Sequence, residues 1–234
     1  MPPSIVKDSS DFQSLTYDRG FRTLFEDGVY LLLASQAEKD LDTANSLARG
    51  SIASTMMLPE VSANICIESL QLERSVFNEI DKLAPVAKFD FFLRTTFRSK
   101  KIPSGVLAVQ KIQELKQLRN TFVHPKRHAV NWYDQGNGEH IGTSESTKYL
   151  DMSKNPAMWD EHDAIKAMLG AHEFLQYFFT ELCGYSKKKV TDLLFSDETA
   201  VGDGTGRVYY YRRSFHQALK RWKIDISYFR IGIL

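Results

Sequence analysis

The chain has few of the features that mark secreted or membrane-spanning proteins. Its 234 residues include only two cysteines, Cys66 and Cys183, too few for a disulfide framework and both in apolar stretches. The longest apolar run, residues 29–34, is far shorter than the roughly 20 residues that cross a bilayer. The first residues lack a basic segment followed by an apolar core, so we expect no secretory signal. These absences predict buried free thiols, a reducing cytoplasmic setting and no association with membranes.

A strong excess of one charge is also lacking. The formal net charge is +1, so any surface that attracts nucleic acid must be local. Hydrophobic residues make up 43% of the sequence, which is enough for the core of a globular protein. The length suits one domain with appendages. We expect a flexible N-terminal arm at residues 1–16, a helical body at 17–184 and a C-terminal appendage at 185–234.

Apolar residues recur at helical spacing along most of the body, which predicts an all-α bundle of four to five long helices. The expected helices cover residues 18–35, 37–72, 75–98, 105–124 and 158–183. Pro59 should kink the second helix or divide it at Leu58, and Pro85 should restart the third. Ser104 is a suitable N-cap for the fourth helix, and Gly184 should end the last.

Residues 125–156 break the helical pattern. They contain several glycines and serines and few large aliphatic residues, and the turn sequence at 134–139 separates two short segments. We therefore expect a hairpin or an irregular loop inserted into the bundle, in a kind of position that often carries function. Beyond the bundle, the pattern predicts a short helix at 186–195 and a linker at 196–206.

The tail, residues 207–234, combines aromatic residues with seven Lys or Arg and a single acidic residue, Asp225. The three tyrosines at 209–211, next to Arg212 and Arg213, could stack on bases and bind phosphates. In the alternative interpretation, which we favour, these aromatics pack on the bundle and the arginines face water. If the first interpretation holds, the protein would belong to a third function class, nucleic-acid-binding proteins that bind through such a tail.

Polar residues that could act on a phosphodiester gather where the fourth helix ends, at residues 115–125. Asn120 and His124 are four residues apart, so they share one helix face, and the long side chain of Arg119 can reach the same place. Pro125 cannot continue the helix, which puts His124 at a C-terminus where the helix dipole favours a protonated imidazole. The residues expected to face the core are Leu115, Leu118 and Phe122.

This arrangement resembles the HEPN superfamily, whose pattern is an arginine, usually followed by a polar residue, and then a histidine, with four to six residues between the arginine and the histidine. Here four residues separate Arg119 from His124, and Asn120 occupies the polar position. The second helix adds a weaker similarity in Pro59 followed by Ala63-Asn64. The resemblance covers residues 20–183 and implies a HEPN-like bundle. It also implies a metal-independent endoribonuclease without a cofactor, whose active site forms across a two-fold homodimer axis.

In that interpretation RNA is cut by its own 2′-OH. His124 would act as the general base or acid, Arg119 would stabilise the charge that develops on phosphorus, and Asn120 would orient the phosphate or the imidazole. Lys126 and Arg127, directly after the motif, would hold the RNA backbone. The products would be a 2′,3′-cyclic phosphate and a 5′-OH. The resemblance places such an enzyme in toxin–antitoxin systems, phage defence or stress responses.

Other interpretations of the same residues stay open. Arg119 could pair with an acidic residue of a neighbouring helix, His124 could cap its own helix, and His128 could replace His124 as the acid–base group. The alternative function is a non-catalytic interaction or dimerisation module of the same fold. Such a module would bind nucleotide, RNA or a protein partner such as an antitoxin of the nucleotidyltransferase type.

Overall fold

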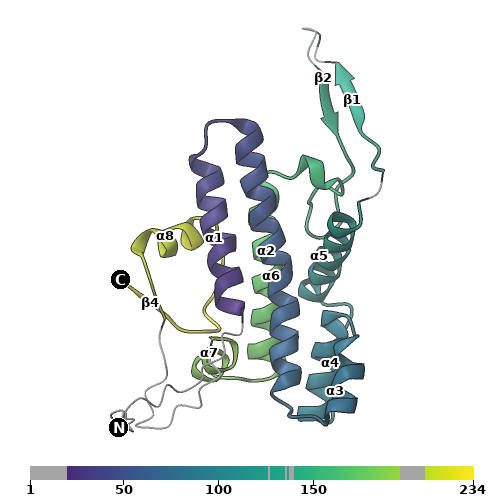
Figure 1. Ribbon diagram of the computed structural model, residues 1–234, viewed down its shortest axis with the longest axis vertical. Coiled ribbons are helices and arrows are strands. Elements are labelled where there is room, and N and C mark those ends of the chain that lie inside the picture. The colour runs from purple at the N-terminus through teal and green to yellow at the C-terminus, as the bar shows by residue number, and fades with distance from the viewer. Residues whose placement is uncertain (1–19, 126, 135, 137–139, 196–208) are drawn as a thin grey trace, which may run out of the picture.

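The computed structural model describes residues 20–125, 127–134, 136, 140–195 and 209–234. Within these residues the protein is mostly helical, as predicted. Five helices form the body: α1 (Phe21–Ala37), α2 (Leu41–Glu68), α4 (Pro85–Thr96), α5 (Leu107–Val123) and α6 (Glu161–Gln176). Helix α1 lies along α2, α6 packs against both, and α5 packs on α6 away from α1 (Figure 1). None of the described helices is long and apolar enough to cross a membrane.

Helix α2 is the longest element and contacts most of the others. Asp40 begins it, because its carboxylate accepts a hydrogen bond from the backbone N–H of Thr43 at 2.9 Å. The helix continues through Pro59 to Glu68, so the predicted alternative of two helices divided at Leu58 is wrong. The third predicted helix does divide at Pro85, into α4 and the short α3 (Arg74–Asp81).

Helix α5 begins later than the sequence suggests. Its N-cap is Val106, whose side chain offers no hydrogen bond to the helix. Ser104 instead lies in a turn closed by the N–H of Val106 and the carbonyl of Pro103, and its own carbonyl accepts from the side chain of Gln110. The predicted N-cap at Ser104 is therefore wrong, because the turn before the helix already uses that residue.

The chain after α6 builds a large part of the core. A π-helical turn (η2, Tyr177–Leu182) extends α6, and Gly184 ends it with φ +69, as predicted. Helix α7 (Lys187–Phe195) confirms the predicted short helix. The described part of the tail forms β3 (Tyr209–Tyr211), α8 (Arg213–Arg221) and β4 (Ile231–Ile233), with β3 parallel to β4. The residues of the predicted linker at 196–206 and of the N-terminal arm at 1–16 lie outside the described residues.

Aromatic residues join this C-terminal part to the bundle. The ring of Phe25 on α1 lies 5.3 Å from Phe215 and 5.7 Å from Phe229, both edge to face, and all three are buried. On α6, the imidazole of His172 is buried and lies 2.8 Å from the hydroxyl of Tyr228. The interpretation that the tail packs its aromatics on the bundle is thus confirmed for most of them, while Tyr210 stays exposed.

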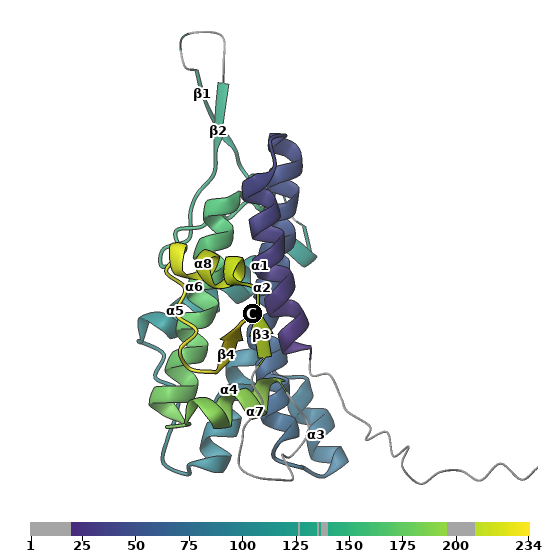
Figure 2. The same cartoon turned by 90° about the vertical axis from the view of Figure 1, so that its left-hand side faces the viewer.

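The insertion between α5 and α6 contains the predicted hairpin. Strands β1 (Asn131–Asp134) and β2 (His140–Thr143) pair antiparallel, with Trp132 opposite Gly142. The hairpin projects beyond the end of the bundle in both views (Figures 1 and 2). Every residue of β1 is exposed, so this two-stranded unit gains little stability from burial.

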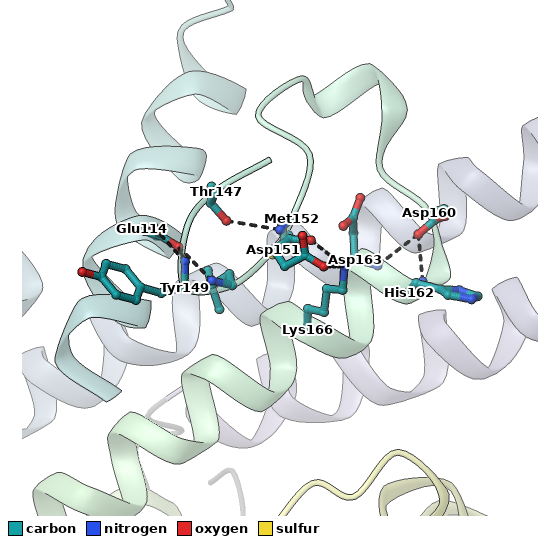
Figure 3. A network of polar contacts seen from close by, with 10 residues as sticks. Glu114, Thr147, Tyr149, Asp151, Met152, Asp160, His162, Asp163 and Lys166 are labelled. Carbon is teal, nitrogen blue, oxygen red and sulfur yellow. Dashed lines mark hydrogen bonds and ion pairs between the residues drawn. The ribbon is translucent and has the colours of Figure 1, made fainter. Parts of the chain in front are cut away.

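Beyond the hairpin the chain is tied back onto α5 and α6 (Figure 3). The carboxylate of Glu114 on α5 accepts hydrogen bonds of 2.9 to 3.1 Å from three successive backbone N–H groups, those of Lys148, Tyr149 and Leu150. Lys166 on α6 pairs with the carboxylate of Asp151 at 2.8 Å. The indole of Trp159 donates to the carbonyl of Ser153 at 2.8 Å. One side of α5 is therefore covered by an ordered segment.

Candidate active site at the end of helix α5

Arg119 lies on the side of α5 that faces α2. Its Nη2 atom is 2.9 Å from Oε2 of Glu60, and the two side chains are only 29% and 26% exposed. The Nε atom of Arg119 is buried and donates no hydrogen bond to a described residue. The ion pair fixes the position of the guanidinium, and one of its N–H donors remains unused.

Sequence analysis did not identify Glu60, although it left open that an acidic residue of a neighbouring helix could pair with Arg119. Glu60 directly follows Pro59 in α2 and shares a small hollow with Arg119, lined also by Met56, Ile112 and Lys116. The only sign of this ion pair in the sequence is that an acidic residue directly follows Pro59. Its orientation toward α5 depends on how the two helices pack.

Asn120 and His124 lie on the exposed part of the helix end. His124 is the C-cap residue, with φ −120 and ψ 75, and its backbone N–H donates to the carbonyl of Asn120 at 2.9 Å. Pro125 follows, as predicted, where the helix has stopped. Neither side chain forms a hydrogen bond or ion pair with a residue that the structure describes, so both are available to a ligand or a partner.

The structure does not bring Arg119 and His124 into contact within one chain. Successive residues of an α-helix are turned by about 100°, so a residue five positions further points about 140° away. Arg119 faces α2, and within the described residues no hydrogen bond or ion pair joins it to Asn120 or His124. Asn120 and His124 share one side of the helix end, as the spacing predicts.

The last turns of α5 also carry apolar side chains. Leu115 and Leu118 are buried, as predicted. Phe122 is not in the core: its side chain is 38% exposed, and its ring stacks on Trp159 with centroids 5.4 Å apart. The prediction of a core position was wrong because the last turn of α5 reaches past the bundle onto the insertion. Val123 is also exposed, so the helix end presents both apolar and polar groups.

The residues after the motif are placed only in part. Lys126 lies outside the described residues. Arg127 is exposed, and no described residue forms an ion pair with it. His128 is half-buried, and its Nε2 atom has no hydrogen-bond partner in the described part of the chain. The structure thus leaves Arg127 accessible near the candidate site.

A groove missed by sequence analysis leads away from Arg119 between α4 and α5. It encloses about 440 Å³ and is lined by Ala84, Val86, Ala87, Asp90, Ile102, Ser104, Val109, Gln113, Lys116 and Gln117. Val86 and Lys116 also line the hollow that holds Arg119. The groove could not be predicted because its walls come from two helices and the loop before α5, which only the tertiary fold brings together.

A buried carboxylate occupies the first turn of α6. Burial, together with the neighbouring Asp160, raises the pKa of Asp163 to about 6, although Lys166 and backbone hydrogen bonds oppose the shift. Its backbone N–H donates to Asp160 at 3.0 Å, within the network that anchors the insertion (Figure 3). In the described part of the chain, no three His, Cys, Asp or Glu side chains are grouped so as to hold a metal ion.

No protein-family model matches the chain, and no curated protein or solved structure is significantly similar to it. The assignment of a function must therefore depend on the residues at the end of α5.

Proposed function

We propose that this protein is a metal-independent endoribonuclease of the HEPN type, with an active site formed where the ends of two α5 helices meet. One observation supports this most strongly. Among the residues that the structure describes, Asn120 and His124 have no side-chain partner, and they are followed or flanked by the exposed apolar residues Phe122 and Val123. Such a helix end can bury its apolar residues against a second copy while its polar groups remain able to bind a phosphate.

Two copies also supply the groups that the reaction requires. The 2′-oxygen of the RNA forms a bond to phosphorus as the bond from phosphorus to the 5′-oxygen breaks. One His124 accepts the 2′-OH proton, and the partner's His124 donates a proton to the leaving 5′-oxygen. Because one imidazole must start neutral and the other protonated, the rate should have a bell-shaped pH dependence. The products are a 2′,3′-cyclic phosphate and a 5′-OH end.

The remaining residues would bind and orient the phosphate. Arg119 would donate hydrogen bonds from the exposed part of its guanidinium to the oxygens that gain charge. Glu60, at 2.9 Å, is a positioning residue that holds the guanidinium. Asn120 would orient the phosphate or the imidazole, and Lys126 and Arg127 would bind the flanking backbone. By its resemblance, the enzyme would serve in a toxin–antitoxin system, in phage defence or in stress.

A cleavage assay on mixed RNA in excess EDTA tests the proposal. The comparison is between the natural chain, His124→Ala and the matched control His162→Ala, which removes another exposed histidine. We expect the natural chain and the control to release fragments with 2′,3′-cyclic phosphate ends and the His124 variant to leave RNA intact. Equal cleavage by all three proteins would exclude His124 as the catalytic group.

The projecting hairpin favours a second candidate, a non-catalytic interaction module. Trp132, Tyr133 and Ile141 are exposed on β1 and β2, and Trp132 is 68% exposed. Aromatic residues of this kind are enriched in protein interfaces. Expression in a host cell separates the two candidates. Growth arrest relieved by changing Arg119 or His124 favours the ribonuclease, whereas harmless expression with intact RNA favours the module.

A further inference from the structure

The C-terminal segment carries most of its charge in one sign. Residues 209–234 contain six Lys or Arg and one acidic residue, Asp225. All six basic side chains are exposed, and none pairs with an acidic side chain of a described residue. Among the described residues, Arg221 alone of the six donates a side-chain hydrogen bond, to the side chain of Gln36. These cations are thus left to interact with solvent or with an anionic ligand.

The fold directs these cations outward. Helix α8 buries Phe215, Ala218 and Leu219 against the bundle, which leaves Arg213 and Lys220 on its solvent side. Asp225 forms no ion pair with any of these six side chains; its carboxylate accepts hydrogen bonds from the N–H of Ser227 at 2.8 Å and from the side chain of Gln176. Three of the six cations, Arg213, Lys220 and Arg221, therefore belong to a helix that is packed on the bundle.

An exposed aromatic ring lies next to these cations. Tyr210 is 59% exposed and stands opposite Gly232 in the β3–β4 pair. A Cβ atom at Gly232 would lie 2.5 Å from two carbons of the Tyr210 ring, so the ring lies directly over the glycine. Because Tyr210 stays mostly exposed, part of its ring is left for a ligand. Arg212 follows β3 and Arg230 precedes β4, so cations flank the ring at both ends of the pair.

We propose that this C-terminal basic surface (Tyr210, Arg212, Arg213, Lys220, Lys223 and Arg230) binds single-stranded RNA, with phosphates on the cations and one base stacked on Tyr210. Phosphate contacts and base–aromatic stacking together are how proteins hold single strands without reading their sequence. An anionic membrane fits less well, because the apolar face of α8 is buried in the bundle and cannot enter lipid.

The surface is separate from the candidate active site. Helices α8 and α5 lie on opposite sides of the bundle, with α1, α2 and α6 between them (Figures 1 and 2). The inference therefore goes beyond the proposed cleavage and holds or fails independently of it. If both are correct, this surface retains the RNA while another part of the strand reaches α5.

Binding of a fluorescent oligouridine, measured by anisotropy over a series of salt concentrations, tests this inference. All proteins carry His124→Ala so that the RNA stays intact. We expect the triple variant Arg213→Gln, Lys220→Gln, Lys223→Gln to bind about tenfold more weakly. The slope of log affinity against log salt should fall by about 2, because each lost phosphate contact removes roughly 0.7.

Matched variants separate this surface from general charge. Lys39, Arg74 and Lys101 are exposed cations elsewhere, without an acidic partner in the described part of the chain, and changing all three to Gln should leave binding unchanged. Tyr210→Ala should weaken binding about tenfold, and Tyr210→Phe, which keeps the ring, should not. Circular dichroism confirms that each variant is folded.

Three results would overturn the inference. These are unchanged binding by the triple variant, an equal loss in the control triple, and tighter binding to vesicles containing phosphatidylserine than to RNA. If the natural chain cuts no RNA but the surface still binds it, the inference about binding stands and the proposed ribonuclease activity fails. If the natural chain cuts RNA but the triple variant binds RNA as tightly as its parent, the ribonuclease activity stands and the inference about binding fails.

Discussion

Two histidines of this protein, His172 and His124, lie in opposite environments. His172 lies in the aromatic core where α6 meets the C-terminal segment, bonded to Tyr228 and shielded from water. His124 stands on the surface, beyond the last turn of α5, without a side-chain partner among the described residues. The first can only serve structure, because burial lowers its pKa to about 3 and keeps it neutral. The second is accessible to substrate, as acid–base chemistry requires.

The largest effect is expected on RNA cleavage when His124 is replaced. We expect His124→Gln to lower cleavage by about 10²–10⁴-fold, the usual range for a general acid or base. The same change should alter the free energy of unfolding by less than about 0.5 kcal/mol, because the side chain is exposed. Single-turnover cleavage and urea unfolding measure the two quantities. A folded, fully active His124→Gln protein would contradict the contrast drawn above.

Asp163 extends the comparison to a buried carboxylate. The pKa of Asp163 is about 6 in the fold, above the ordinary aspartate value of 3.8, so the folded state binds its proton more tightly than the unfolded chain. Stability is therefore lost as pH rises from about 4 to above 6. Asp163→Asn should stabilise the protein by up to about 3 kcal/mol at pH 8, and by much less at pH 4. Urea unfolding at both pH values measures this, with the exposed Asp27 on α1 as the site of a control substitution.

His172 should act in the opposite direction. Its pKa falls from 6.5 to about 3 on folding, so its contribution is complete above pH 6.5 and declines as the pH falls toward 3. Between pH 7 and pH 5 the loss should be about 2 kcal/mol. This is best measured in the Asp163→Asn background, because Asp163 otherwise offsets part of it. A flat stability profile there would show that His172 is not shielded from protons.

The smallest effect is expected at the ion pair that holds Arg119. Glu60→Gln removes the charge 2.9 Å from the guanidinium but keeps the shape of the side chain. A partly exposed pair contributes roughly 0.2–1 kcal/mol to stability, so folding should change little. Cleavage should fall about tenfold through kcat, because the guanidinium is no longer fixed where the charge develops. Arg22 and Glu26 form an exposed pair at 2.7 Å that serves as the control.

Sequence periodicity predicted the helices well because their stability comes from apolar faces that recur every three or four residues. It located α7, the hairpin and the stop at Gly184. It misplaced Phe122 and the cap at Ser104, because each depends on what a neighbouring segment does with the residue. Sequence periodicity did not predict the role of Glu60 or the groove between α4 and α5. Sites that residues from several helices form together are set by tertiary packing, which a local pattern does not contain.

The attachment of the insertion through Glu114 has a consequence for how this protein can vary. Three backbone N–H groups bind one carboxylate on α5 directly after the hairpin, so the chain regains a fixed position before it enters α6. Changes in the length of the hairpin therefore end at this anchor and do not shift either helix. Related chains should differ most in length between residues 131 and 143. An acidic residue at position 114 should be kept more often than the residues of β1 and β2.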